Sequence, residues 1–353
     1  MVLTSVHEPR MNGVPHDGAR HAGPRPSVAG RRWPSGHIAA LDLGTNNCRL
    51  LVARPVGQGF RVVDAFSRIV RLGEGLAASG ALSEEAMART LEALEICAQK
   101  LAVRRSLKGR YVATEACRRA ANCTAFLERV HERFGLDIEI ISTAEEARLV
   151  VAGCAPLLDP RIPHAIVFDI GGGSTEIVWV RLARERRRPH PAPQILGSVS
   201  LPLGVVTLTD RFGGEVSPAA YRLMVEEAAI ALAPFERRHG IARLIRLGRV
   251  QMLGSSGTVT TLAGIHLALP RYTRALVDGR QLTFKQIAAV SAHLAALDLA
   301  GRAASPCVGE ERADLVLSGC AILDAICATW PVGRLWVADR GVREGILFDL
   351  MQA

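Results

Sequence analysis

From Gly36 onward the chain alternates short apolar runs with longer amphipathic stretches, whereas residues 1–36 are polar and aperiodic. In residues 37–55 two apolar runs flank the turn-like segment 44–47, which predicts a strand, a tight turn and a second strand. The rest of the first half is predicted to form strands at 60–72, 109–116 and 136–142, and helices at 84–103, 122–134 and 143–158. Ser83, followed directly by two glutamates, predicts a capped start for the first of these helices.

The second half of the chain repeats this order of elements. Residues 164–180 again predict strand, turn and strand, and residues 194–201 predict a third strand. The remaining predicted elements are strands at 249–257 and 333–341, and helices at 217–238, 258–269, 284–298, 310–329 and 342–351. Two βββαβα passes predict two similar α/β domains at 37–160 and 161–353. The ligand is expected in the cleft at the carboxyl ends of their strands. One large α/β domain with two halves alike by chance is the alternative.

Composition narrows the class of protein. No charge-free apolar stretch is long enough for a membrane helix and no signal peptide precedes the first strand, so no membrane partner is expected. The eight cysteines are scattered without a CxxC pair, which favours reduced thiols and a cytoplasmic location. We interpret residues 1–36 as a disordered basic tail, or as the product of a start codon upstream of the true one at Met11.

The net charge of +9 is concentrated in two segments, residues 1–36 and the arginine-rich run 181–193. Such segments attract polyanions in general. Solvated, incidental charge is the simpler interpretation of both. Since no DNA- or RNA-binding motif or series of aromatic residues accompanies them, no specific nucleic-acid partner is expected.

The two predicted turns carry the chemistry. Glycine permits positive φ angles and lets an anion approach backbone N–H groups. Two such donor loops, facing each other, predict a phosphate clamp. The donors are Gly44, Thr45, Asn46 and Asn47 in the first loop, and Gly171, Gly172, Gly173, Ser174 and Thr175 in the second. Because side chains alternate along a strand, Ser174 and Glu176 are expected to share the face toward the cleft.

Asp42 and Asp169 end the strands that lead into these loops. A carboxylate beside bound phosphates is repelled unless a cation intervenes, so the sequence predicts Mg²⁺ between them. A third loop, at the start of the predicted helix 258–269, favours anions through unpaired N–H groups, or is an ordinary capped helix start. Its predicted ligands are Gly254, Ser255, Ser256, Gly257 and Thr258. Neither a GxxxxGK[ST] nor a GxGxxG motif is present.

Six segments occur in an order that resembles one family: ALDLGTNNCRLLV, VATEACRRAANCTAFL, EIISTAEEARLV, VFDIGGGSTEIV, GSSGTVTTLAG and DRGVREGIL. Over about residues 37–350 the chain is similar to the Ppx/GppA phosphatases, which are exopolyphosphatases and guanosine pentaphosphate phosphohydrolases. The resemblance implies duplicated ribonuclease H-like domains of the acetate kinase–sugar kinase–Hsp70–actin superfamily, with an interdomain cleft.

The resemblance also implies roles for single residues. Glu146 matches the general base that activates the attacking water, although the sequence leaves open whether Glu145 or Glu146 faces the cleft. Glu176 matches the second acid, which holds the water or, together with Asp42 and Asp169, the metal. Arg118 matches an arginine that grips phosphate.

Other matches and mismatches qualify this picture. Asn122 closes the arginine motif but is as well explained as a helix N-cap, and Arg343 and Glu344 are interpreted as structural or substrate-lining. Thr143 replaces a usual glycine and Asn47 a usual serine. The sequence resembles a short form of the family, without the C-terminal HD-type extension of the larger relatives, so we expect a weaker grip on long chains.

The implied activity is Mg²⁺-dependent release of terminal orthophosphate from inorganic polyphosphate. Hydrolysis of guanosine pentaphosphate is the nearest alternative. A kinase of the same superfamily, or a nucleotide-binding protein without turnover, is a more distant one. A homodimer is one assembly that the resemblance allows.

Overall fold

The computed structural model describes residues 36–104, 107–182 and 193–352. The predicted tail and most of the basic run 181–193 lie outside the described residues. The first half forms a sheet in the order β3-β2-β1-β4-β5, in which β1, β2 and β3 are antiparallel and β4 and β5 run parallel to β1. Its strands are β1 (His37–Leu43), β2 (Asn47–Val56), β3 (Gly59–Ile69), β4 (Leu107–Ala113) and β5 (Ile138–Ile140).

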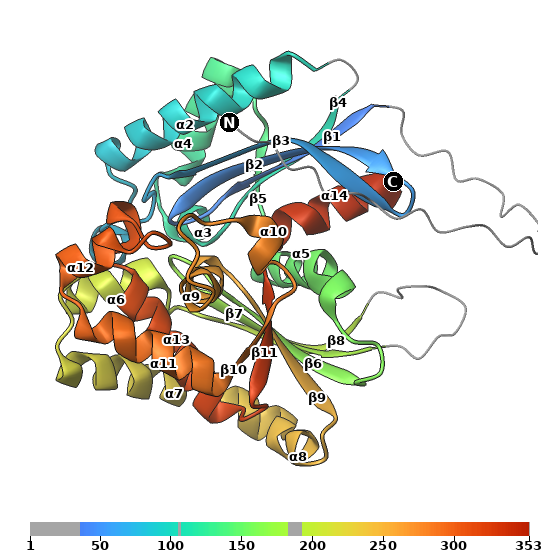
Figure 1. Cartoon of the computed structure of the whole chain (residues 1–353). Coiled ribbons are helices and arrows are strands. Elements are labelled where there is room, and N and C mark those ends of the chain that lie inside the picture. The colour runs from blue at the N-terminus through green and yellow to red at the C-terminus, as the bar shows by residue number, and fades with distance from the viewer. Residues whose placement is uncertain (1–35, 105–106, 183–192, 353) are drawn as a thin grey trace, which may run out of the picture. The chain divides into compact units, whose positions relative to one another are not determined.

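Helices cover both faces of this first sheet (Figure 1). On one face lie α2 (Glu84–Ala102) and α4 (Cys123–Phe134), whose apolar sides pack on the core, and on the other lies the last helix of the chain, α14 (Val342–Gln352). The cap predicted at Ser83 is confirmed, since its side chain accepts a hydrogen bond from the backbone of Ala86 at 3.2 Å. Two short helices, α1 (Leu76–Ser79) and α3 (Glu115–Arg119), complete the first half.

The second sheet has the order β10-β11-β9-β6-β7-β8. Its run β8-β7-β6-β9-β11 repeats the order and directions of β3-β2-β1-β4-β5, so the duplicated α/β fold predicted from the sequence is confirmed, and only the edge strand β10 is additional. The strands are β6 (His164–Ile170), β7 (Thr175–Arg181), β8 (Gln194–Leu201), β9 (Val250–Ser255), β10 (Gln281–Thr283) and β11 (Arg334–Ala338).

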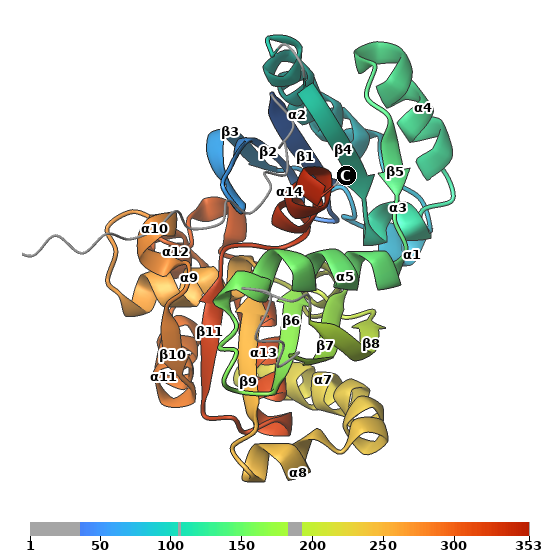
Figure 2. The ribbon, with the colours of Figure 1, turned by 90° about the vertical axis from the view of Figure 1, so that its right-hand side faces the viewer.

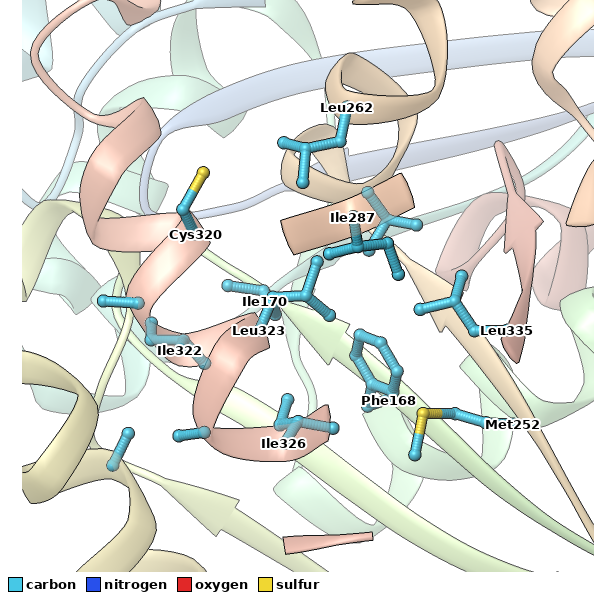
Figure 3. Packing of buried hydrophobic residues seen from close by; sticks show 14 of the residues in the cluster. Phe168, Ile170, Met252, Leu262, Ile287, Cys320, Ile322, Leu323, Ile326 and Leu335 are labelled. Atoms are coloured by element: carbon cyan, nitrogen blue, oxygen red, sulfur yellow. The ribbon is translucent and has the colours of Figure 1, made fainter. Parts of the chain in front are cut away.

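The larger apolar core packs between this sheet and its helices. Figure 3 shows Phe168, Ile170 and Met252 of the sheet against residues of α13 such as Ile322 and Ile326. The helices of this half are α6 (Val205–Phe212), α7 (Pro218–His239), α8 (Ile241–Arg246), α9 (Gly257–His266), α10 (Arg274–Val277), α11 (Phe284–Ala296), α12 (Leu299–Ala304) and α13 (Val316–Thr329), with 3₁₀ turns η1 (Ala155–Leu157) and η2 (Glu310–Arg312).

Two helices lie between the sheets (Figure 2): α5 (Thr143–Cys154), which ends the first half, and α14. They approach each other so closely that only glycine fits at the crossing. A Cβ on Gly153 would lie 2.2 Å from the carbonyl oxygen of Gly341, and one on Gly345 would lie 2.1 Å from that of Leu149. The last helix, α14, returns to pack on the first sheet, so the chain crosses between the two halves more than once. The predicted domain boundary at residue 160 therefore stays a prediction.

Three sequence predictions need correction. The strand predicted at 109–116 ends at Ala113, and Glu115 begins α3 instead. The helix predicted at 310–329 starts only at Val316, after η2. Asn122 occupies the N-cap position of α4 without capping it, because its amide is hydrogen-bonded to both backbone groups of Leu82, at 2.8 and 2.9 Å. Within the described ranges, none of the helices combines the length and apolar character needed to cross a membrane.

Candidate active site

A cavity of about 120 Å³ lies where the two hairpin loops meet, with room for a phosphoryl group and several waters. The predicted ligands that line it are Asp42, Gly44, Thr45, Asn46, Asn47, Glu146, Asp169, Gly171, Gly172, Gly173, Ser174, Glu176, Ser256, Gly257 and Thr258. Three other predicted ligands do not line the cavity, because contacts within the protein account for them: Thr175, Gly254 and Ser255. Thr175 donates to the carbonyl of Leu203, Ser255 donates to that of Arg340, and Gly254 gives room to the ring of Phe168.

The two hairpins place their polar side chains in the same way. Asp42 is paired across the strands with Arg49, and Asp169 with Glu176, each seven residues further along the chain. Both turns close with the same bond, from Gly44 N to the carbonyl of Asn47 and from Gly171 N to that of Ser174, at 2.9 Å each. The spacing of Asp169 and Glu176 is therefore set by strand register.

Two glycines of the second loop, Gly172 and Gly173, have a structural reason that the sequence did not show, while the approach of an anion to this backbone stays a prediction. None of Gly171, Gly172 and Gly173 has a positive φ angle, so that part of the sequence argument was wrong. Instead the second loop packs directly on the first: a Cβ on Gly172 would lie 3.0 Å from the backbone nitrogen of Asn46, and one on Gly173 would lie 2.8 Å from the hydroxyl of Thr45. Bare backbone lets the two loops meet.

These loops keep free donors at the cavity. Among the residues that the structure describes, the amides of Thr45, Asn46, Gly172 and Gly173 donate to no backbone carbonyl. The third loop adds the N-terminus of α9, where the non-glycine Ser256 is held at φ 127°. Strain of this kind is concentrated at functional sites. Uncommitted N–H groups from three loops fit an anion.

Glu146 faces this cavity and Glu145 does not, which answers the question that the sequence left open. Glu146 is 8% exposed, and its Oε2 forms an ion pair with Nη1 of Arg118 at 2.7 Å but no hydrogen bond of regular geometry among the described residues. Burial raises the pKa of Glu146 well above its usual range, the charge of Glu176 adds to this, and Arg118 opposes it. Glu145 instead is hydrogen-bonded first to Arg148 and also to Arg110, which lower its pKa to about 2.

The other acids are also desolvated. Glu176 is 3% exposed, and its Oε1 accepts hydrogen bonds from Ser174 at 2.7 Å and Ser200 at 2.9 Å, so Ser174 and Glu176 do share the cavity face. Burial raises the pKa of Glu176, and these serines oppose the rise. Burial, and next the charge of Glu176, raise the pKa of Asp169 to about 7. Burial likewise raises the pKa of Asp42, which the charge of Arg49 opposes.

The two aspartates fit a hard cation. They are desolvated oxygen donors, one from each half of the chain, and a cation would stabilise their ionised forms. Within the described residues, however, no three acidic, histidine or cysteine side chains converge to hold a metal ion together. Glu176 is committed to two serine hydroxyls, so the three-ligand set expected from the sequence is not preformed. One or two carboxylates, with phosphate oxygens and waters, are the usual ligands of Mg²⁺.

Arg118 lies behind the cavity wall and not in its lining. Its Nη1 lies 2.7 Å from Oε2 of Glu146 and donates to the carbonyl of Ile141 at 2.9 Å, while Nε and Nη2 donate to Glu115. Glu344, expected to be structural or substrate-lining, is 1% exposed and accepts from Arg274 and the backbone of Gly341, so it is structural.

Sequence reasoning missed several cavity residues: Arg49, Glu115, Arg312 and, behind Glu176, Ser200. Arg49 could have been found, because it stands seven residues after Asp42 as Glu176 does after Asp169. Its positive charge opposes the rise that burial causes in the pKa of both aspartates. Arg312 comes from a distant segment and carries no local signal.

The fold and the site together define a class. Two sheets of the same strand order, with a cavity of glycine loops and acids between their hairpins, form a duplicated α/β architecture, and solved structures of similar chains share this fold. The model of the Ppx/GppA phosphatase family matches residues 51–353, and the chain belongs to this family.

Individual relatives agree with this assignment. A Haemophilus influenzae protein named "Putative exopolyphosphatase" is 28% identical over 319 residues, which are 89% of this chain and 91% of that protein. The solved structure of an exopolyphosphatase-like protein superposes with a TM-score of 0.80 at 26% identity, covering 90% of this chain and 98% of the other. The Aquifex aeolicus PPX-GPPA enzyme gives a TM-score of 0.71 at 28% identity, covering 89% and 99%.

Proposed function

We propose that the protein is an exopolyphosphatase, which releases terminal orthophosphate from inorganic polyphosphate with the help of Mg²⁺. The observation that carries the proposal is the carboxylate of Glu146, which is buried at the cavity and has an ion pair with Arg118 at 2.7 Å as its polar contact among the described residues. A desolvated carboxylate of raised pKa, beside loops of free N–H groups, is suited to take a proton from water next to a bound phosphate.

The reaction is an in-line attack of water on the terminal phosphorus. The new bond joins the water oxygen to phosphorus, and the anhydride bond to the next phosphate breaks with its electron pair on the leaving chain. Glu146 takes the proton of the water and returns it to solvent. The amides of Thr45, Asn46, Gly172 and Gly173 stabilise the charge on the transferred group.

Asp42 and Asp169 would hold the metal. When bound, Mg²⁺ would supply positive charge to the transferred and leaving phosphates. In this scheme Glu176 orients the attacking water. Its side chain is fixed for this role because Oε1 accepts hydrogen bonds from Ser174 and Ser200.

Polyphosphate is proposed over guanosine pentaphosphate because two relatives carry names that point to polyphosphate, a "Putative exopolyphosphatase" and an exopolyphosphatase-like protein. The eight cysteines are all free thiols, which favours action in the cytoplasm.

The test is phosphate release from long-chain polyphosphate, guanosine pentaphosphate and ATP, each with magnesium and with excess EDTA. We expect polyphosphate to give the highest kcat/KM and EDTA to abolish turnover. A higher kcat/KM on guanosine pentaphosphate would reverse the substrate assignment, and release from none of the three would refute the function.

A further inference from the structure

Glu115 stands at the cavity wall between the second glycine loop and Arg118. It lines the cavity with a side chain only 14% exposed, and a Cβ on Gly173 would lie 3.2 Å from its Cγ. The same side chain binds Arg118 three residues later on α3, through Nε at 3.2 Å and Nη2 at 2.9 Å. Glu115 is thus a carboxylate beside the loop at which the proposed function places a phosphate.

The donors of Arg118 are nearly all in use. A guanidinium has five N–H groups. Two of them go to Glu115, one goes to Ile141, and the Nη1 group also lies 2.7 Å from Oε2 of Glu146. That leaves a single Nη2 N–H for any other acceptor, so a two-pronged grip of Arg118 on phosphate requires that Glu115 release it.

We propose that Glu115 is a positioning residue that holds the guanidinium of Arg118 against Glu146 and keeps it away from the phosphate. This inference rests on the proposed function. Removing the charge of Glu115 has two consequences. First, Arg118 is freed to turn toward the anion, and a like charge is lost from the cavity, so the ground state of the substrate binds more tightly. Second, Arg118 no longer holds Glu146 in place, so turnover slows.

The experiment separates the effect of the negative charge of Glu115 from the effect of its side-chain length. Glu115→Gln removes the charge and keeps the length, whereas Glu115→Asp keeps the charge and shortens the side chain. Glu139→Gln is the matched control, since Glu139 is also a carboxylate paired with an arginine, Arg110, but does not line the cavity. Binding of inorganic tripolyphosphate is measured by calorimetry in EDTA, so that it is read without magnesium, and kcat and KM for polyphosphate are measured with magnesium.

Glu115→Gln is expected to bind tripolyphosphate about threefold to tenfold more tightly and to lose about tenfold in kcat, in line with the cost of small misplacements at a reacting centre. Glu115→Asp keeps the like charge but holds Arg118 less well, so it is expected to gain less affinity than Glu115→Gln and to lose kcat, and the control to keep both. Unchanged affinity and kcat in Glu115→Gln would overturn the inference. Weaker binding would do so too, because it would mean that Glu115 aims Arg118 at the phosphate.

The proposed function fails in a different way. Wild-type protein that binds no tripolyphosphate and releases no phosphate overturns the function and, with it, the role of Glu115. Wild-type protein that binds and turns over, while Glu115→Gln behaves like the control, overturns the role of Glu115 alone.

Discussion

Replacing Asp169 by asparagine is expected to make the metal-free protein more stable at high pH. The carboxyl group of Asp169 has a pKa of about 7 in the folded protein, against an ordinary value of 3.8, because it is buried close to Glu176. The folded state therefore favours the protonated acid. Between about pH 4 and pH 7 the folded chain binds more protons than the unfolded chain, so this group costs stability as the pH rises through that window, and the cost is complete above about pH 7.

The size of the cost follows from the shift. About three pH units correspond to about 4 kcal/mol, an upper limit because nearby groups relax. For a protein of this size, a gain of about 2–4 kcal/mol in the free energy of unfolding raises Tm by roughly 3–6 °C. Asp169→Asn should show that gain at about pH 8 and almost none at about pH 4. Asp137→Asn, in which an exposed carboxylate is replaced, is the control.

The assay is differential scanning calorimetry in EDTA across this pH range, repeated with excess magnesium. Magnesium should stabilise the wild type at pH 8 and not Asp169→Asn, because the ion binds the ionised carboxylate. A variant that is equally destabilised at both pH values would refute the argument, since it would show that Asp169 serves as a packing and hydrogen-bonding group and carries no desolvated charge.

Three further changes test the scaffold. Gly345→Ala should lower the free energy of unfolding by at least about 2 kcal/mol and reduce phosphate release, because its Cβ would strike the carbonyl of Leu149 and push α5 away from α14; wild-type Tm and rate would contradict this. Ser83→Ala should cost about 1 kcal/mol in chemical denaturation, through the lost cap of α2, with unchanged activity. For Glu145, whose pKa is lowered to about 2 chiefly by Arg148, the contribution to stability is present above about pH 4.5 and is lost as the pH falls toward 2. Glu145→Gln should therefore cost about 1 kcal/mol at pH 7, allowing for its partial exposure, and less at pH 3; a cost independent of pH would exclude the ion pairs as its cause.

Much of the fold was predictable because its signals are local. Turn residues between apolar runs identify both hairpins, and alternation from Ser174 into β7 places Ser174 and Glu176 on one face. Strand order repeats because both halves carry the same sequence of elements. The edge strand β10 was missed because Leu282 is its single apolar residue, whereas the equally short β5 lies in the apolar-rich run 136–142.

The missed parts of the site depend on contacts between distant segments. Glu115 follows an alternating run and was assigned to the strand, but β4 ends at Ala113 and the chain turns into α3. The role of Asn122 is set by Leu82, forty residues earlier. The first loop packs directly against Gly172 and Gly173 of the second loop, a contact that no local pattern shows.

The central claim is that Glu146 activates the attacking water, and the paired variants Glu146→Gln and Glu145→Gln test it most directly. The two acids are neighbours on α5, but only Glu146 lines the cavity. Phosphate release from polyphosphate should fall by about 10²–10⁴-fold in Glu146→Gln, as expected for the loss of a general base. It should stay within a few-fold of wild type in Glu145→Gln. A Glu146→Gln variant that folds and keeps the wild-type rate on polyphosphate and guanosine pentaphosphate would contradict the claim.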